Sequence, residues 1–312
     1  MKISIVVPFF NEEKCVDEFF KRTLDVLSAE KEIANYEIIA VNDGSKDTTI
    51  ARLTAAAGLN QKIKIVDLSR NFGHQVAISA GIHFATGDYT VILDGDLQDP
   101  PEVIAQMLKK MNEGFDVVYA VRRKRKEGLF KRACYFTFYR ILKYVAHTDI
   151  PLDSGDFCVI SRRVCDILKS MPEKNRFIRG LRSWLGFNQA GIEYERTDRF
   201  ADKPKYSYLG LIKLAVDGLI SFSSFPIKLA SIVGFVLASL SLVGGIAFIV
   251  FRLIVGMSVP GITTVIVLLL FISGIQLISI GIIGEYIARI FDETKQRPLF
   301  IVKNLINLKE DR

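Results

Sequence analysis

The sequence contains few of the residues that build metal clusters and disulfide frameworks. It has 4 cysteines and 3 histidines among 312 residues. The cysteines, Cys15, Cys134, Cys158 and Cys165, form no Cys-x-x-Cys pair, and no histidine lies at metal-ligand spacing from them. A zinc site or a set of structural disulfides is therefore not supported, and we expect reduced thiols in a protein that faces the cytosol.

Two nucleotide-binding signatures are also absent. No Gly-x-Gly-x-x-Gly follows the first apolar run, and no Gly-x-x-x-x-Gly-Lys-Ser/Thr is present. The dinucleotide-binding and P-loop classes are therefore poorly supported. With only 9 prolines, 24% charged residues and 11% aromatic residues, the composition excludes a disordered, collagen-like or low-complexity chain.

Hydrophobic residues make up half of the chain, and the formal net charge is +7. The length suits one large domain or two smaller ones. The mean hydropathy of +0.27 is high for a purely soluble protein. We therefore expect part of the chain to contact lipid.

Two uncharged runs near the C-terminus have the length of membrane spans. Leu229–Phe251 has 23 uncharged residues between Lys228 and Arg252, and Val265–Gly284 has 20. At about 1.5 Å per residue these helices would reach roughly 35 and 30 Å, against a bilayer core of about 30 Å. Turn residues link them at Gly256–Gly261. We predict a two-helix transmembrane hairpin over 227–252 and 262–286, because buried helices of a soluble core are seldom this long and free of charge.

Cations flank the hairpin on one side. The connecting loop has only Arg252, whereas cations precede the first span at Lys205, Lys213 and Lys228 and follow the second at Arg289, Lys295 and Arg297. The positive-inside rule then predicts an integral membrane protein with both termini, and the domain over 1–207, on the cytoplasmic side. Residues 287–312 would form a cytoplasmic tail. Ile3–Phe10 is too short for a signal peptide and reads as a buried strand.

The segment over 208–226 is amphipathic. Its apolar residues recur at helical spacing, at Tyr208, Leu211, Ile212, Ala215, Leu219 and Phe222. This pattern is typical of a helix in the membrane interface, and a helix packed on the soluble domain is the alternative. In the second span, Gly274, Gly281 and Gly284 allow close helix approach without a Gly-x-x-x-Gly motif, so a homo-oligomer is left open.

Residues 1–207 alternate between strand and helix patterns. Helical periodicity over Glu13–Leu27 and Pro101–Met111 separates β-branched runs at Ile3–Val7, Glu37–Val41, Ile63–Leu68, Tyr89–Leu93 and Val117–Val121. This order predicts an α/β domain with a Rossmann-like, mostly parallel, doubly wound sheet. Ligands of such sheets bind at the carboxyl ends of the strands, and each predicted strand is followed there by polar residues.

The fourth of these strand ends carries two acidic residues, Asp94 and Asp96, with Gln98 and Asp99 beyond them. Such oxygen ligands favour a hard divalent cation, Mg²⁺ or Mn²⁺, which keeps coordination positions open for a substrate diphosphate. An isolated Asp-x-Asp is common and is more often a solvated turn. Its place at the end of a buried strand favours the metal site here.

Several motifs resemble those of family 2 glycosyltransferases with the GT-A fold. They are Ile5–Glu13, Val41–Asp47, Leu68–Gln75, Leu93–Pro101, Asp153–Arg163, Asn175–Phe187, Gly284-Glu-Tyr-Ile287 and Arg297–Val302. More closely, they resemble the polyprenyl-phosphate glycosyltransferases, which include bactoprenol glucosyltransferases and dolichol-phosphate mannose synthases. The resemblance covers nearly the whole chain. Asn175–Gly180 and Trp184–Phe187 look more like the bactoprenol glucosyltransferase branch.

The chain departs from the family patterns in two places. Arg199–Tyr206 has Asp202 and Pro204 where the family often has glycine and serine. The Gln-x-x-Arg-Trp motif of processive polysaccharide synthases is absent, since Arg182-Ser-Trp184 has the wrong spacing. We therefore expect a single sugar transfer rather than polymerisation.

The resemblance implies roles for residues on the donor side. Pro8, Asn11, Glu12 and Asp43 would hold the base and ribose of a nucleotide sugar. Asp94 and Arg122 would also contribute to binding the nucleotide sugar. Asp94 and Asp96, with Gln98, would bind Mg²⁺ or Mn²⁺ on the diphosphate. Such a metal stabilises the charge that develops on the departing nucleotide diphosphate. His74 lies in a family motif, and we assign it packing or hydrogen bonding.

The acceptor side raises a separate chemical question. A lipid phosphate has a second pKa near 6, so it is already an anionic nucleophile at neutral pH and has little need of a general base. By resemblance Asp156 lies near the acceptor, where a base role and a positioning role both remain open. Two anionic substrates also require cations between them, and the candidates are Arg122, Arg179, Arg182, Arg199 and Lys205.

The basic run Arg122–Lys126, with aromatic residues after it, has two interpretations. Such a pattern can indicate nucleic-acid binding. Beside two membrane spans, anionic lipid headgroups and the acceptor phosphate are the more economical partners, so we expect no nucleic acid.

Together these patterns and the resemblance predict a metal-dependent inverting hexosyltransferase. It would transfer a single glucose from UDP-glucose to polyprenyl (undecaprenyl) phosphate for cell-envelope glycan modification. The catalytic domain would lie on the cytoplasmic face of a bacterial inner membrane. One alternative is a dolichol-type mannose synthase that uses GDP-mannose. A second, from a different class, is a non-catalytic membrane scaffold that binds nucleotide sugar.

Overall fold

The computed structural model describes residues 1–122, 154–174, 176–195, 225–255 and 261–308. The chain divides into two compact units, one formed by Met1–Tyr208 with Arg297–Arg312 and the other by Leu209–Gln296. The sequence analysis assigned 287–312 to a separate tail, whereas the last residues belong to the first unit. The predicted interface helix, except for its last two residues, lies outside the described residues, as do Arg199, Lys205 and Cys134.

The first unit is built on an eight-stranded, mostly parallel sheet with the order β7-β5-β6-β4-β1-β2-β3-β8. The pairs β1·β2, β1·β4, β2·β3 and β5·β7 are parallel, and three pairs are antiparallel. The five predicted strands are confirmed as β1 (Lys2–Phe9), β2 (Asn35–Asn42), β3 (Ile63–Leu68), β4 (Tyr89–Ile92) and β5 (Val117–Arg122).

Three further strands complete the sheet: β6 (Ser154–Ser161), β7 (Gln189–Tyr194) and β8 (Val302–Ile306). The sequence analysis did not predict them, because each is short or interrupted by glycine, asparagine or charged residues. β6 runs antiparallel between β4 and β5 and therefore brings the start of its own chain segment to the carboxyl ends of its neighbours.

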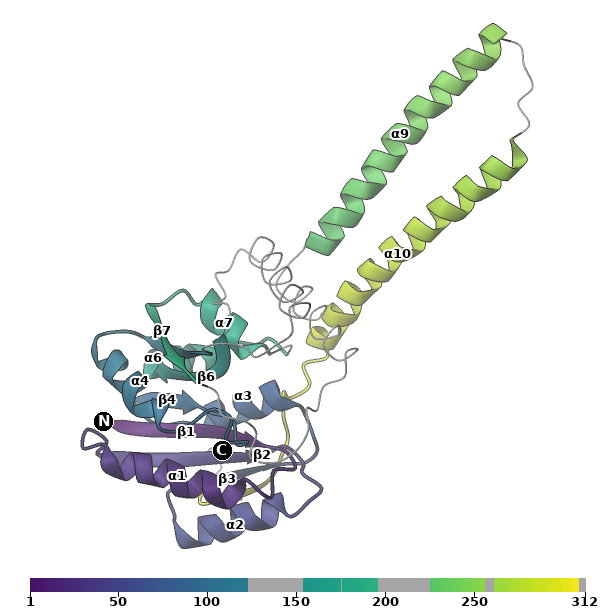
Figure 1. Cartoon of the computed structure of the whole chain (residues 1–312). Coiled ribbons are helices and arrows are strands. Elements are labelled where there is room, and N and C mark those ends of the chain that lie inside the picture. The colour runs from purple at the N-terminus through teal and green to yellow at the C-terminus, as the bar shows by residue number, and fades with distance from the viewer. Residues whose placement is uncertain (123–153, 175, 196–224, 256–260, 309–312) are drawn as a thin grey trace. The chain divides into compact units, whose positions relative to one another are not determined.

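Helices cover both faces of the sheet (Figure 1). The predicted helical segments are confirmed as α1 (Val16–Ala29) and α4 (Val103–Asn112). The other helices of this unit are α2 (Thr49–Leu59), α3 (His74–Phe84), α6 (Arg162–Ser170) and α7 (Ile178–Trp184). Because both faces are covered, the central strands need continuous apolar runs, and seven of the eight β1 residues are buried.

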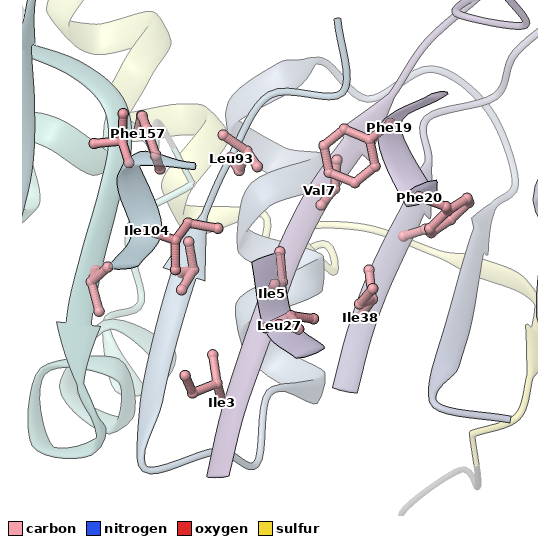
Figure 2. Close-up of a cluster of buried hydrophobic side chains, with 14 of the residues drawn as sticks. Ile3, Ile5, Val7, Phe19, Phe20, Leu27, Ile38, Leu93, Ile104 and Phe157 are labelled. Carbon is pink, nitrogen blue, oxygen red and sulfur yellow. The ribbon is translucent and has the colours of Figure 1, made fainter. Parts of the chain in front are cut away.

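Alternate side chains of β1 enter two different layers. Ile3, Ile5 and Val7 pack with Phe19 and Phe20 of α1 in the main core (Figure 2). On the opposite face, α3 approaches closely, since a Cβ atom added at Gly81 would lie 2.3 Å from Val6 Cγ1. This approach holds α3 directly over the central strands, so the start of α3 lies near their carboxyl ends.

The last strand closes one edge of the sheet. β8 pairs antiparallel with β3, and the Ser69 backbone N–H donates to the Ile301 carbonyl at 2.9 Å. The Asn307 amide nitrogen donates to the carbonyls of Ala57 and Ile63, at 2.9 and 2.8 Å. Residues after the predicted spans are therefore part of the sheet of the first unit.

The second unit contains two long helices, α9 (Phe225–Val255) and α10 (Ile262–Thr294). In the part of the chain that the structure describes, one segment, Phe271–Thr294, is long and apolar enough to cross a bilayer. A shorter apolar stretch, Ala230–Ser241, lies within α9, where the sequence analysis puts the first span. Two crossings therefore remain a prediction.

Candidate active site

The loops after β1 and β2 are joined by hydrogen bonds at the carboxyl edge of the sheet. Asn11 adopts a positive φ of 54°. Its side-chain oxygen accepts from the Lys46 backbone N–H at 2.8 Å, and its own N–H donates to Ser45 Oγ at 3.1 Å. The Glu12 N–H donates to Thr49 Oγ1 at 3.0 Å. Pro8 is buried within β1, just before this loop.

Asp43, immediately after β2, organises the loop that follows β3. Its side chain is buried, and its two carboxylate oxygens accept from the backbone N–H groups of Phe72 and Gly73, at 2.7 and 3.0 Å. Burial raises the pKa of Asp43, and these two bonds oppose the rise. In this structure the carboxylate predicted to meet the nucleotide base thus also holds the segment that leads into α3.

Asp94 and Asp96 follow β4 in a tight loop. Asp94 Oδ1 is buried without a hydrogen-bond partner and lies 3.4 Å from His74 Nε2. Burial raises the pKa of Asp94 to about 6 against the opposing effect of His74. Asp96 is 9% exposed and accepts from the Gln98 backbone N–H at 3.1 Å. Gly95 lies between them because a Cβ atom there would lie 2.5 Å from the Phe9 ring.

Asp156, on β6, is surrounded by donors. Gln75 Nε2 donates to its Oδ2 at 2.8 Å, Arg179 Nε donates to its Oδ1 at 3.2 Å, and His74 Nε2 lies 3.4 Å from Oδ2. Burial favours the neutral acid, but Arg179 and His74 outweigh it and hold the pKa of Asp156 far below its usual range. Asp156 is therefore a carboxylate at neutral pH.

His74 connects the two acidic positions. The same Nε2 atom lies 3.4 Å from both Asp94 and Asp156. Burial lowers the pKa of His74, but the two carboxylates raise it overall to about 9, so the imidazole is cationic at neutral pH. The sequence analysis gave His74 only packing or hydrogen bonding. The signal that pointed to a role in the site was the position of His74 in the motif Leu68–Gln75.

Arg122 reaches the site from the end of β5. Its Nε donates to the Tyr194 hydroxyl at 3.3 Å, and that hydroxyl donates to Asp99. A Cβ atom added at Gly155 would lie 3.2 Å from an Arg122 terminal nitrogen, so the guanidinium lies against the backbone beside Asp156. Burial lowers the pKa of Arg122, but Asp99 and Tyr194 outweigh it and raise the pKa. The sequence analysis missed Tyr194, which no motif marked.

The structure corrects one of the predicted phosphate contacts. Arg182 is fully buried, with its guanidinium carbon 5.0 Å from the centre of the Tyr119 ring. Among the described residues its side-chain nitrogens have no hydrogen-bond partner. Arg182 comes three residues after Arg179 and therefore lies on the same side of α7. Unlike Arg179, it is covered by the interior of the first unit. It is therefore not available to a lipid phosphate in this structure.

The loop of Asp94 and Asp96 provides only part of the coordination shell of a hard cation, so a further ligand must complete it. Within the described ranges, no three His, Cys, Asp or Glu side chains are grouped to hold a metal ion. Asp94 has a buried oxygen without a hydrogen bond and a raised pKa, and a divalent cation would relieve both. Asp94 and Asp96 therefore fit Mg²⁺ or Mn²⁺ with open positions, whereas for Gln98 the described contact is through its backbone N–H.

This fold and this site define the class. A mostly parallel α/β sheet, with an acidic pair after a central strand and cations facing a buried carboxylate, has the architecture of a GT-A domain. The family model for glycosyl transferase family 2 matches residues 4–168. The chain therefore belongs to glycosyl transferase family 2.

Curated relatives align over the full length. The chain is 45% identical to the uncharacterized glycosyltransferase YkcC of Bacillus subtilis (strain 168), over 100% of this chain and 96% of the relative. It is 42% identical to the uncharacterized glycosyltransferase sll0501 of Synechocystis, over 99% and 97%. It is 39% identical to the bactoprenol glucosyl transferase of Shigella phage SfV, over 97% and 99%.

Proposed function

We propose that this protein is an inverting glycosyltransferase that transfers one glucose from UDP-glucose to polyprenyl (undecaprenyl) phosphate. The observation that carries the proposal is the arrangement around His74, which brings Asp94 of the acidic loop and Asp156 of β6 to one imidazole nitrogen at 3.4 Å. The similarity to bactoprenol glucosyl transferase over 97% of the chain supports the lipid acceptor and the sugar.

On the donor side, Asp94 and Asp96 would hold Mg²⁺ or Mn²⁺, with Gln98 as a candidate ligand. When bound, such a cation stabilises negative charge on the departing nucleotide diphosphate. Pro8, Asn11, Glu12 and Asp43 would hold the base and ribose beside it. This assignment is supported by the hydrogen bonds that fix the loops of Asn11 and Asp43 at the same edge of the sheet.

The proposed reaction is a single displacement. A lipid-phosphate oxygen attacks the anomeric carbon with its own electron pair, and the bond from that carbon to the nucleotide diphosphate breaks on the opposite face. The nucleophile is an anion, so no proton has to be removed. The strongly lowered pKa of Asp156 supports a positioning role over a base role, because so weak a base accepts protons poorly.

Cations would lower the repulsion between the two anionic substrates. Arg122 and Arg179 are the described candidates, since both lie beside Asp156 or its neighbouring backbone. Arg199 and Lys205 stay predictions outside the described residues. On the proposed topology, α9 and α10 cross the membrane and hold the catalytic unit at the cytoplasmic face, where the acceptor phosphate lies.

The test is turnover by the full chain in detergent or nanodiscs. With undecaprenyl phosphate and Mg²⁺ or Mn²⁺, we expect UDP release from UDP-glucose, and loss of at least about 100-fold in Asp94→Asn and Asp96→Asn, the scale of removing transition-state charge stabilisation. Asp166→Asn is the matched control, since Asp166 is an exposed α6 residue paired with Arg162. Preference for GDP-mannose in a donor panel would favour the mannose synthase, and nucleotide binding without turnover would favour the scaffold.

A further inference from the structure

One side chain beside the site uses both ends of its amide to join three elements. Gln75 lies in the first turn of α3. Its Nε2 donates to Asp156 Oδ2 on β6 at 2.8 Å, and its Oε1 accepts from the Ile178 backbone N–H at 2.8 Å. Ile178 is the first residue of α7. Gln75 therefore lies between the carboxylate of the acceptor side and the helix that carries Arg179.

The bond to Ile178 has a specific structural consequence. The first N–H groups of a helix have no partner within the helix, and the residue before α7, Phe177, provides no side-chain cap. Gln75 supplies that missing acceptor from another element. Because Arg179 follows Ile178 directly, the position of the α7 start determines where the guanidinium meets Asp156.

We propose that Gln75 is a positioning residue for the acceptor side, which fixes Asp156 and Arg179 relative to each other so that the pair can receive the lipid phosphate. The inference rests on the proposed function for its substrate. It adds a residue that contacts neither the metal ligands nor the nucleotide-binding loops in the described contacts. The alternative is that Gln75 only fills space at the start of α3.

Substitutions at Gln75 can distinguish the positioning role from the space-filling role. The amide combines an NH₂ group that donates with a carbonyl oxygen that accepts, and both groups are used here. Glutamate at this position would keep the acceptor for Ile178 but would face Asp156 with a second negative charge. Leucine has a similar volume but would leave the Ile178 N–H and one Asp156 oxygen without this partner. A space-filling role predicts that leucine is tolerated.

The effect of a Gln75 substitution should be confined to the acceptor side, because the loop before α3 is held in place by other contacts. Asp43 holds Phe72 and Gly73 through its carboxylate, independently of the Gln75 side chain. A change at Gln75 therefore leaves the contacts of Asp43 in place. UDP affinity should stay within about twofold of the wild type, whereas use of the lipid phosphate should fall.

The experiment compares Gln75→Leu and Gln75→Glu with the matched control Gln106→Glu, which adds a charge at an exposed α4 position. We expect kcat/KM for undecaprenyl phosphate at saturating UDP-glucose to fall about 10- to 100-fold in Gln75→Leu, the scale of one hydrogen bond to a charged group, and further in Gln75→Glu. UDP binding is measured separately by calorimetry. Equal losses of UDP affinity and acceptor turnover would overturn the inference.

Amide hydrogen exchange gives a second readout that needs no turnover. In Gln75→Leu, backbone amides at the start of α7 should exchange faster than in the wild type, while those of α1 should not change. Unchanged exchange in α7 would refute the positioning role, as would wild-type acceptor turnover in both Gln75 variants. If the wild-type chain transfers no sugar to polyprenyl phosphate, the proposed function fails, and exchange in α7 still decides the role of Gln75.

Discussion

The charge state of Asp156 is set by its neighbours rather than by its own chemistry. A buried carboxylate without partners would be a stronger base than usual, since burial raises its pKa. Here Arg179 and His74 lie against the same carboxylate and hold its pKa far below its usual range, and Gln75 also donates a hydrogen bond to it. A residue in this state orients cations and substrates better than it removes protons.

The pH profile of an Asp156→Asn variant tests this interpretation. Since the folded-state pKa of Asp156 is lowered, the carboxylate stays ionised through the whole assay range above about pH 5 and adds no acidic limb to the rate. We expect kcat in Asp156→Asn to fall by about 10-fold or more at every pH, with the shape of the profile unchanged. An acidic limb that is present in the wild type and lost in the variant would instead show a base.

At the scale of elements, the start of α3 is where the site is assembled. The loop from β3 reaches α3 through Gly73, which has a φ of 99°, and Asp43 holds that loop from β2. Gly44, with a φ of 65°, lets the two loops meet, since a Cβ atom there would lie 2.5 Å from the Arg70 backbone. β6 then enters antiparallel and presents Asp156 to the His74 and Gln75 side chains.

The edge strand β8 stabilises the strand that leads into this loop. Asn307, directly after β8, has a positive φ of 58°, and its side-chain amide donates to the carbonyls of Ala57 in α2 and Ile63 in β3. We expect Asn307→Ala to lower the free energy of unfolding by about 1–3 kcal/mol, because both bonds are lost and alanine disfavours this backbone conformation. Asn307→Gly should cost less, because glycine accepts the positive φ.

Thermal unfolding of the purified chain measures this effect. For a unit of this size, each kcal/mol corresponds to a midpoint shift of about 2–4 °C. Lys303→Ala, at an exposed position of β8, the strand just before Asn307, is the control and should leave the midpoint unchanged. An unchanged midpoint in Asn307→Ala would mean that β8 adds no stability through this residue.

At the scale of the whole molecule, the first unit is interrupted in sequence by the second, for which the sequence predicts the membrane spans. Leu209–Gln296 lies between the two segments that form the first unit, and it contains the apolar segment Phe271–Thr294. The chain thus leaves the catalytic unit after Tyr208 and returns to it at Arg297. If both ends of the inserted unit lie on one side of the bilayer, the inserted unit must cross an even number of times.

Cysteine labelling in intact cells tests the two-span topology. In a Cys134→Ser background, an impermeant maleimide should label Ser258→Cys, in the link between the predicted spans, from outside the cell. Ser170→Cys, at an exposed position of α6, should react only after the membrane is permeabilised. Reaction of both positions only after permeabilisation would contradict two crossings.

Much of the fold was predictable because the central strands are buried on both faces. Ile3–Val7 and Ile63–Leu68 are rich in apolar, β-branched residues because they fit between two helix layers, and such runs are visible in a sequence. The sequence pattern did not predict β6, because its first residues are Ser-Gly-Asp, which serve the site rather than the packing of the sheet. β8 lies at an edge, and its two adjacent polar residues, Lys303 and Asn304, make this short segment resemble a tail.

The sequence by itself determined the α/β class, the acidic pair after the fourth strand and the family, because local residue order carries each of them. Tertiary structure alone decided which distant side chains share a charge environment. It buried Arg182 while Arg179, three residues earlier, met Asp156, and it brought His74 and Gln75 to the same carboxylate. The reason is physical, since burial and the distance between charges are set by packing between elements and not by spacing along the chain.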